Sequence, residues 1–440
     1  MKYDKFFQLA KEAGIEEAEL FIKQSYSLEI SVFHGEVENY SNNNAFSIFA
    51  RGLVNGKFGT VFADVYDNKK AEFLVKEIIN NAKVIENKDP QFIFGGSPKY
   101  KRVSTFNKQL ADISIEEKMN KLFELEKLIK DGDKRISEVQ SVDYEEAMTT
   151  VTLMNSKGLK LVDKSNYFMY VGSAVAKDKD AVKSGYEVFL DNDFSKLNIK
   201  DLANKVVENT VSQLGGEPCE SKTYKAVLSR EVLSSLLGFY ISNASAEDVQ
   251  KNSSLFKDQL NKQIASKKLT VEDRPLTKSL FARAFDDEGV ATYNKPIIKN
   301  GVLMTYLYNL TTAAKDGVES TGNGSRAGSK MSAEPHFLWV KPGKRSKEEL
   351  FEKIKDGVYI TEVSGLHAGM NARSGNFSLQ SSGFLIKDGK KERPLDIITI
   401  SGNLIDVFKD IVEVGKDEQT FIASVSCPSV LIKKLKVSGK

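Results

Sequence analysis

The sequence predicts an α+β protein of two domains, with an antiparallel sheet and covering helices in the first half and a β-rich second half. Three observations indicate this fold class. Apolar and polar residues alternate along several segments, other segments have helical spacing, and Asn-Gly and Asp-Gly pairs recur at short intervals after residue 280. At 440 residues the chain is too long for one ordinary core. A second half of this kind is typical of a barrel or of stacked sheets.

The first elements follow from hydrophobic spacing. Residues 4–13 have the apolar pattern of a helix, and segments 28–33 and 46–50 alternate as strands do, on either side of the polar residues 41–44. Asn55-Gly56 between two apolar runs predicts a tight hairpin, because both central residues of a type I′ turn need positive φ. The sheet is therefore expected to be antiparallel here.

Three more helices and a second group of strands complete the first half. Helices are predicted over 69–82, from a capping box at Ser114 to Gly132, and over 196–213, with strands between 138 and 190. Residues 214–218, which read Leu-Gly-Gly-Glu-Pro, are the clearest break in the chain. We therefore predict one domain over 1–213 and a second over 219–440.

The second half contains only short helical patterns. They cover 231–241, 310–316 and 347–355, and the last is opened by a capping box at Ser346 and expected to close at Gly357. Everything else is predicted to be short strands and tight turns.

Composition excludes several classes of protein. The 63 basic and 60 acidic residues are spread along the chain, so a nucleic-acid partner is not expected. No stretch approaches the roughly 20 apolar residues of a membrane span. The two cysteines, Cys219 and Cys427, have no CxxC spacing and no secretory leader precedes them, which favours a reducing cytoplasm.

Histidines are too few and too scattered for a common zinc site. A zinc peptidase generally needs two histidines one helical turn apart and a carboxylate for the water proton. The chain has only His34, His336 and His367, each without a second histidine nearby. Each is expected to be structural or on the surface, and only His367, close to Arg373, lies in a segment typical of a functional loop.

Two polar segments are alternatives for ligand binding. Asp286-Asp287-Glu288 has the oxygen ligands of a cation site, but an acidic turn that caps local backbone N–H groups is the favoured interpretation. The loop 320–326 presents backbone N–H groups and the Arg326 guanidinium to a carboxylate or phosphate, or is a long turn with polar caps. Covalent catalysis is not expected, because the chain has no GxSxG elbow.

Glycine-punctuated segments follow one another at 285–289, 298–301, 320–323, 375–378, 383–389 and 400–404. Their order resembles the TldD/PmbA family, once called modulators of DNA gyrase. The resemblance covers nearly the whole chain, including the hairpin at 51–59, and the closing segment from Cys427 to Gly439 resembles the PmbA (TldE) branch.

The resemblance implies a cytosolic zinc metalloprotease in which a TldD chain and a TldE chain pair to degrade unfolded or peptide-like substrates. The TldD chain carries an HExxxH helix and a cysteine near its C-terminus. In this sequence the corresponding helix is 232–243, where Gly238 and Asn243 fall near the two histidine positions and Phe239 falls near the glutamate. Cys427 lies too close to the C-terminus to match the metal cysteine.

The leading hypothesis is therefore a PmbA/TldE-like subunit without catalytic residues or a metal of its own, with zinc expected in a TldD-type partner. The chain is expected to be inactive alone and to form this heterodimer, or a homodimer. The substrate-cavity candidates are Asn323, Arg326, His367 and Arg373.

Two alternatives stay open at this point. One is a self-sufficient metallopeptidase with an unrecognised metal site, for which His336, His367 and Asp286 are the available residues. The other is a non-enzymatic regulator that binds peptides or a topoisomerase.

Overall fold

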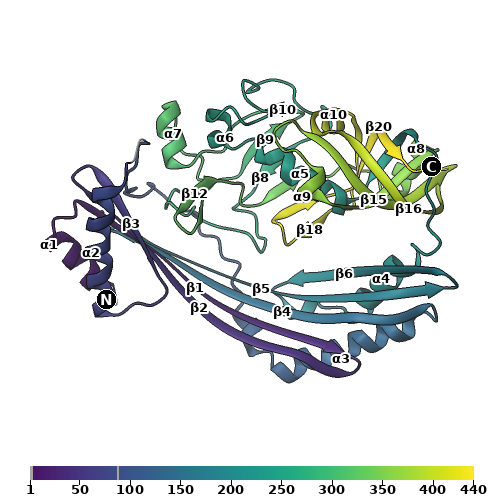
Figure 1. Cartoon of the computed structure of the whole chain (residues 1–440), viewed down its shortest axis with the longest axis horizontal. Coiled ribbons are helices and arrows are strands. Elements are labelled where there is room, and N and C mark those ends of the chain that lie inside the picture. The colour runs from purple at the N-terminus through teal and green to yellow at the C-terminus, as the bar shows by residue number, and fades with distance from the viewer. Residues whose placement is uncertain (1–2, 87–88) are drawn as a thin grey trace.

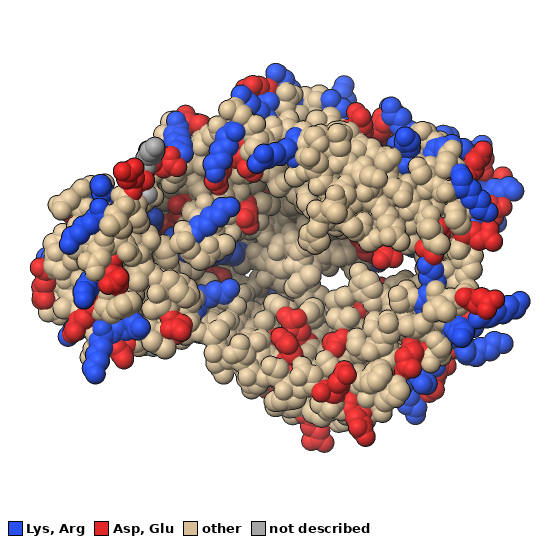
Figure 2. Space-filling model, in the orientation of Figure 1, with Lys and Arg blue, Asp and Glu red and all other residues tan. Residues whose placement is uncertain are grey.

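The computed structural model describes residues 3–86 and 89–440, and it has the predicted α+β architecture. An N-terminal curled sheet lies opposite a β-rich C-terminal half (Figure 1). The space-filling view shows a deep hollow between the two halves (Figure 2). The domain limits 1–213 and 219–440 stay a prediction.

The N-terminal sheet has six strands in the order β3-β2-β1-β4-β5-β6, and every neighbouring pair is antiparallel. Its strands are longer than the sequence pattern predicts. The polar residues 41–44 lie inside β2 and pair with 26–29 of β1, because their exposed position tolerates polar side chains. The strands are β1 (Glu17–Phe33), β2 (Glu36–Val54), β3 (Lys57–Ala63), β4 (Ile136–Asn155), β5 (Lys160–Asp178) and β6 (Ala181–Asp191).

The predicted hairpin at Asn55-Gly56 is confirmed. Asn55 has φ 50° and Gly56 has φ 76°, the positive values that the turn between β2 and β3 requires. The turn sets Leu53 opposite Phe58, so the register of the two strands follows from local sequence.

Four helices cover the convex side of this sheet in two pairs (Figure 1). α1 (Asp4–Glu12) and α2 (Asn68–Val84) lie at one end, and α3 (Ile115–Gly132) and α4 (Ile199–Val211) at the other. The Ser114 hydroxyl accepts the Glu117 N–H, which confirms the predicted start of α3. Short 3₁₀ turns at Lys108–Asp112 and Phe194–Lys196 precede α3 and α4.

Gly59 of β3 lies directly beneath α2, and its replacement by alanine is expected to destabilise the N-terminal half by about 3 kcal/mol or more. An added Cβ would lie 1.8 Å from the Ile78 carbonyl oxygen and 2.9 Å from the Ala82 nitrogen, so the helix would have to move. Chemical denaturation measures the effect. Gly238→Ala is the matched control, because its Cβ would meet no atom within 4 Å and alanine favours a helix by about 1 kcal/mol. Equal stability of the two variants would contradict the close approach.

The C-terminal half contains two six-stranded sheets and a two-stranded hairpin. One sheet has the order β16-β15-β14-β7-β20-β17, and an additional β16–β20 pairing closes five of its strands into a barrel, as the sequence predicted for this half. The other has the order β10-β9-β8-β13-β19-β18. The strands are β7 (Lys222–Leu228), β8 (Val271–Asp273), β9 (Lys295–Lys299), β10 (Val302–Leu303), β11 (Gly324–Ala327), β12 (Lys330–Ala333), β13 (Leu338–Val340), β14 (Gly357–Ser364), β15 (Asn376–Lys387), β16 (Lys390–Asn403), β17 (Ile411–Val414), β18 (Gln419–Phe421), β19 (Val425–Cys427) and β20 (Val430–Ser438).

The helices of this half are short. α5 (Arg230–Ser242), α7 (Leu310–Asp316) and α8 (Lys347–Ile354) lie where they were predicted, and the Ser346 capping box is confirmed. The predicted stop at Gly357 is wrong: Lys355 ends α8 with φ 60°, and Gly357 begins β14. α6 (Ala246–Gln250), α9 (Leu366–Gly369) and α10 (Leu404–Lys409) were not predicted, because a helix of four to six residues leaves no periodic signal.

None of the helices in residues 3–86 and 89–440 combines the length and the apolar character that crossing a membrane requires.

Candidate functional site

Helix α5 and the residue that follows it carry Gly238, Phe239 and Asn243, the three positions that the family resemblance predicts to correspond to the metal motif of TldD chains. The Ser229 hydroxyl caps the helix by accepting the Val232 N–H, and its apolar face packs in the core of the C-terminal half. Gly238 is exposed, with open space where a side chain would stand, and Phe239 packs partly buried against the core. Neither residue has a side-chain atom that binds a metal.

Asn243 follows the last turn of α5, and its polar atoms are already used. Its Oδ1 accepts the Leu255 N–H at 2.8 Å, its Nδ2 donates to the Phe239 carbonyl at 3.0 Å, and its own carbonyl accepts the Ser254 hydroxyl at 2.6 Å. The side chain is 4 % exposed. Asn243 therefore fastens the following loop to the end of α5, which is a structural role.

Cys427 lies in β19 at the opposite end of the same helix. Its thiol donates to the Arg230 carbonyl at 3.3 Å, and burial raises its pKa well above the usual value, so the group stays a thiol. Among the residues that the structure describes, no group of three or more His, Cys, Asp or Glu side chains is arranged to hold a metal ion. The sequence gives no signal for the contact between Cys427 and α5, because the two are about 200 residues apart in the chain.

The three histidines lie in three different environments. His34 occupies the β1–β2 turn with φ 54° and contacts Glu138 at 2.7 Å. His336 is buried, its Nε2 contacts the Gly322 carbonyl oxygen at 2.8 Å, and burial lowers its pKa, so the imidazole is neutral at pH 7. His367 is exposed in α9.

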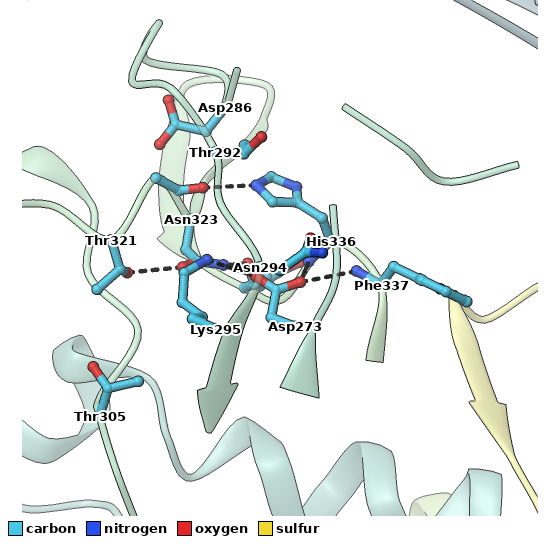
Figure 3. A network of polar contacts seen from close by, with 12 residues as sticks. Asp273, Asp286, Thr292, Asn294, Lys295, Thr305, Thr321, Asn323, His336 and Phe337 are labelled. Atoms are coloured by element: carbon cyan, nitrogen blue, oxygen red, sulfur yellow. Dashed lines mark hydrogen bonds and ion pairs between the residues drawn. The ribbon is translucent and has the colours of Figure 1, made fainter. Parts of the chain in front are cut away.

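A polar network centred on Asp273 lies where β8 ends and β9 begins (Figure 3). The carboxylate is 0 % exposed and accepts four hydrogen bonds. The donors are Lys295 Nζ at 3.0 Å, Asn323 Nδ2 at 2.8 Å, His336 N at 3.0 Å and Phe337 N at 3.1 Å. Burial favours the neutral acid, but Lys295 and the hydrogen bonds outweigh it and hold the pKa of Asp273 below its usual range.

Asn323 is part of this network and is fully buried. Besides its bond to Asp273, it accepts the Thr321 hydroxyl at 2.8 Å and donates to the Glu334 carbonyl at 2.9 Å. All of these contacts are internal. The assignment of Asn323 to a substrate cavity stays a prediction, and in this structure the side chain connects the 320–326 loop to β8.

The acidic turn caps backbone N–H groups, as the sequence favoured. Asp286 Oδ1 accepts from Glu288 N at 3.0 Å and from Val290 N at 2.9 Å, and Oδ2 accepts from Gly324 N at 2.8 Å. Burial, and then the neighbouring Glu288 carboxylate, raise the pKa of Asp286 to about 8. The folded chain therefore holds a proton on Asp286 at neutral pH.

Arg326 joins the two halves of the molecule. The side chain is 4 % exposed, and its Nη2 lies 4.0 Å from Glu19 of β1, which is itself bonded to Arg51 of β2 at 2.7 Å. Its Cζ lies 4.2 Å from the centre of the Phe49 ring. Burial, and then Arg51, lower the pKa of Arg326 to about 10, so the guanidinium is still charged at pH 7. Its assignment to a substrate cavity also stays a prediction.

Arg373 lies at a pocket of about 370 Å³ beside the end of α5. The pocket is lined by Arg373 and by residues 248 and 251–254, and Ser254 in this lining is the residue bonded to Asn243. The turn after α9 is close as well, since Gly375 faces Leu255. The structure therefore brings Arg373 close to Asn243, which stays a predicted degenerate metal position, whereas Asn323 and Arg326 do not line this pocket.

A larger pocket of about 610 Å³ was not predicted. Tyr100, Lys101 and Arg102 line it together with Lys160 and Phe285 of two other segments. No single motif marks it, because its walls come from three parts of the chain that only the tertiary fold brings together.

The comparisons with known proteins agree along the chain. Residues 18–82 match PmbA/TldA metallopeptidase domain 1, residues 108–214 match the central domain, and residues 221–439 match the C-terminal domain of the same family. A metalloprotease PmbA homolog from Buchnera aphidicola is 29 % identical over 433 residues, which are 96 % of this chain and 93 % of the relative. Metalloprotease PmbA from Escherichia coli O157:H7 is 27 % identical over 75 % of this chain and 71 % of its own length.

Solved structures share the whole fold. A putative modulator of a DNA gyrase from Thermotoga maritima superposes with a TM-score of 0.92 and 32 % identity over 99 % of both chains. TldE from Thermococcus kodakarensis has a TM-score of 0.91 over 100 % of both chains at 21 % identity, which is evidence for the fold alone. The ordered glycine motifs, the α+β architecture and these matches lead to one conclusion: the chain belongs to the PmbA/TldD metallopeptidase family.

Proposed function

We propose that this chain is the non-catalytic subunit of a TldD/TldE-type zinc metalloprotease that degrades unfolded or peptide substrates in the cytoplasm. The observation that carries the proposal is the helix α5, where Gly238, Phe239 and Asn243 stand at the motif positions. The first two have no ligand atom, and Asn243 has its polar atoms bonded to the backbone. Zinc would be bound by the TldD-type partner.

The pocket beside α5 supports a role in substrate binding for the same subunit. Arg373 is exposed there and has a planar guanidinium that suits a carboxylate, and Lys251 adds a second cation. Together with exposed His367 of α9, Arg373 offers a polar surface at the position of the degenerate metal site. We propose this surface as the contribution of the subunit to a shared substrate cavity.

A self-sufficient metallopeptidase has less support. Both carboxylate oxygens of Asp286 accept backbone N–H groups inside the protein, and His336 is buried against Gly322. His367 is exposed on α9. These residues are engaged in separate places and do not supply the three converging ligands of a catalytic zinc site.

The purified chain alone is expected to contain substoichiometric zinc and to leave an unfolded peptide intact, and cleavage is expected only after a TldD-type chain is added. Mass spectrometry measures the zinc content, and a fluorogenic peptide assay measures cleavage. Each measurement is made with and without the partner. An Arg373→Gln variant is expected to raise the KM of the pair several-fold with little change in kcat. Arg102→Gln, at the other pocket, is the control. Stoichiometric zinc together with cleavage by the lone chain would overturn the proposal.

A further inference from the structure

Strand β5 has an open edge near its start. The strand pairs with β4 from Lys160 onward, but its pairing with β6 begins only at Phe168, opposite Asp191. Figure 1 shows β6 ending while the neighbouring strands continue. Among the residues that the structure describes, no segment replaces β6 by forming backbone hydrogen bonds to 161–167. An open edge presents backbone N–H and C=O groups with which an added strand can pair.

The segment 99–107, which has no regular secondary structure, lies alongside this edge and is fixed at both ends. At one end the Tyr100 hydroxyl donates to the Gly289 carbonyl at 2.7 Å. At the other end Asn107 N donates to Asn166 Oδ1 at 2.9 Å, and Asn166 Nδ2 donates to the Asn107 carbonyl at 2.8 Å. The segment is therefore held next to β5 by side chains and not by a strand ladder.

The pocket of about 610 Å³ lies between this segment and the edge, and we call it the edge groove. Its walls are residues 100–104 on one side and 160–162 of β5 on the other. Val162 is 51 % exposed, and the buried Phe285 ring contacts the Tyr100 ring edge-on at 6.4 Å between centroids. The groove thus combines an apolar lining with an open strand edge.

The charge of the edge groove has one sign. Between residues 90 and 111 the sequence contains four basic residues and no acidic one. Lys101 and Arg102 are exposed and line the groove together with Lys160, and Lys164 is exposed farther along β5. None of the described residues that line the groove is Asp or Glu. An occupant that complements this groove is therefore negatively charged.

We infer that the edge groove binds an extended, acidic stretch of an unfolded polypeptide, which adds to β5 as a strand. In strand addition the backbone hydrogen bonds supply affinity, and alternate side chains meet the pockets beside the edge. Apolar side chains of the added strand would contact Val162, and acidic ones would face Lys101 and Arg102. Lysine on an edge strand also keeps two identical edges apart, whereas an acidic chain is attracted to it. Binding here requires neither zinc nor cleavage, so it goes beyond the proposed function.

Fluorescence anisotropy of the full chain with a labelled octapeptide of alternating glutamate and valine tests the inference. We expect a dissociation constant of about 1–100 µM that rises with ionic strength. The double variant Lys101→Glu, Arg102→Glu is expected to raise it at least about tenfold. Methylation of every second peptide nitrogen, at the valines or at the glutamates, is expected to abolish binding of one of the two isomers, because only one set of N–H groups faces β5.

Lys267→Glu, Lys268→Glu is the matched control, since it makes the same charge change at two adjacent exposed residues of the C-terminal half. It is expected to leave the dissociation constant within about twofold of the wild type. Thermal unfolding checks that both double variants are folded. The fluorogenic peptide of the cleavage assay carries no acidic residue, so Arg102→Gln remains a control there.

Three results would overturn the inference. The first is a folded Lys101→Glu, Arg102→Glu variant that binds the octapeptide as tightly as the wild type. The second is binding of both methylated isomers as tightly as the parent peptide, which would exclude pairing with β5. The third is a single-stranded oligonucleotide that binds to the groove more tightly than the octapeptide. Each would leave the proposed function standing, because zinc content and partner-dependent cleavage are measured without the octapeptide.

Discussion

Replacement of Asp273 by alanine is expected to lower the free energy of unfolding by about 3–5 kcal/mol, because it leaves a buried ammonium group without its partner. Lys295 is 4 % exposed and lies 3.0 Å from the carboxylate, and three further donors would lose their acceptor. Each buried donor without a partner adds its own desolvation cost. Equilibrium denaturation in urea, followed by tryptophan fluorescence of Trp339 in β13, measures the change beside the substituted residue.

Asp201→Ala is the control for this prediction. Asp201 also forms an ion pair, with Lys205 at 2.8 Å, but its side chain is 57 % exposed. Its loss is expected to cost less than about 1 kcal/mol. The double variant Asp273→Ala, Lys295→Met is expected to recover part of the stability, because it removes the unpaired charge as well. Similar losses for Asp273→Ala and Asp201→Ala would show that the buried pair is not important for stability.

Stability is expected to fall as the pH rises from about 6.5 to 8, because the folded chain keeps a proton on Asp286. The raised pKa of about 8 means that the folded state binds this proton more tightly than the unfolded state, whose carboxyl has the usual value of 3.8. The stabilisation is therefore complete below pH 3.8 and is lost as the pH rises through 8, by up to about 1.4 kcal/mol per pH unit. Below pH 6.5, His336 contributes the opposite pH dependence. Burial lowers its pKa in the folded state, so its contribution makes the protein less stable as the pH falls.

Asp286→Asn is expected to flatten this pH dependence, because the amide does not titrate and its oxygen still accepts the Glu288 and Val290 N–H groups. The variant loses the Gly324 bond and is expected to be less stable than the wild type near pH 6.5 by about 1 kcal/mol. Urea midpoints of the wild type and of Asp286→Asn at several pH values measure how the stability of each protein depends on pH. Asp201→Asn, at an exposed carboxylate, is the control. A wild-type midpoint that stays constant between pH 6.5 and 8 would contradict the proton on Asp286.

The local sequence predicted the hairpin and the helix caps, because each of them depends on a few neighbouring residues. The Asn55-Gly56 hairpin needs two residues with positive φ, and the Ser114 and Ser346 caps need one hydroxyl near one helix start, so neighbours in the chain are sufficient. The length of β2 was not predictable in this way. Residues 41–44 have no strand pattern, and they are extended because β1 supplies the backbone partners.

The candidate site was predicted only in part, for a similar reason. The family resemblance predicts that α5 corresponds to the helix of the metal motif, and this stays a prediction, whereas the structure shows that Asn243 bonds to the loop that follows α5. The position of Arg373 beside this helix end depends on the contact between Gly375 and Leu255, which are far apart in sequence. Asn323 and Arg326 were selected as loop residues, and the fold buries both.

By itself the sequence determined the class of fold, the family and the scarcity of histidines, because each depends only on residue types and on the order of short segments. Only the tertiary structure decided which of those residues meet. It placed Arg326 against Glu19 across the two halves, set Lys295 beside Asp273, and brought Arg373 close to the end of α5. Such contacts join residues tens to hundreds of positions apart, and their strength depends on burial, which no local pattern specifies.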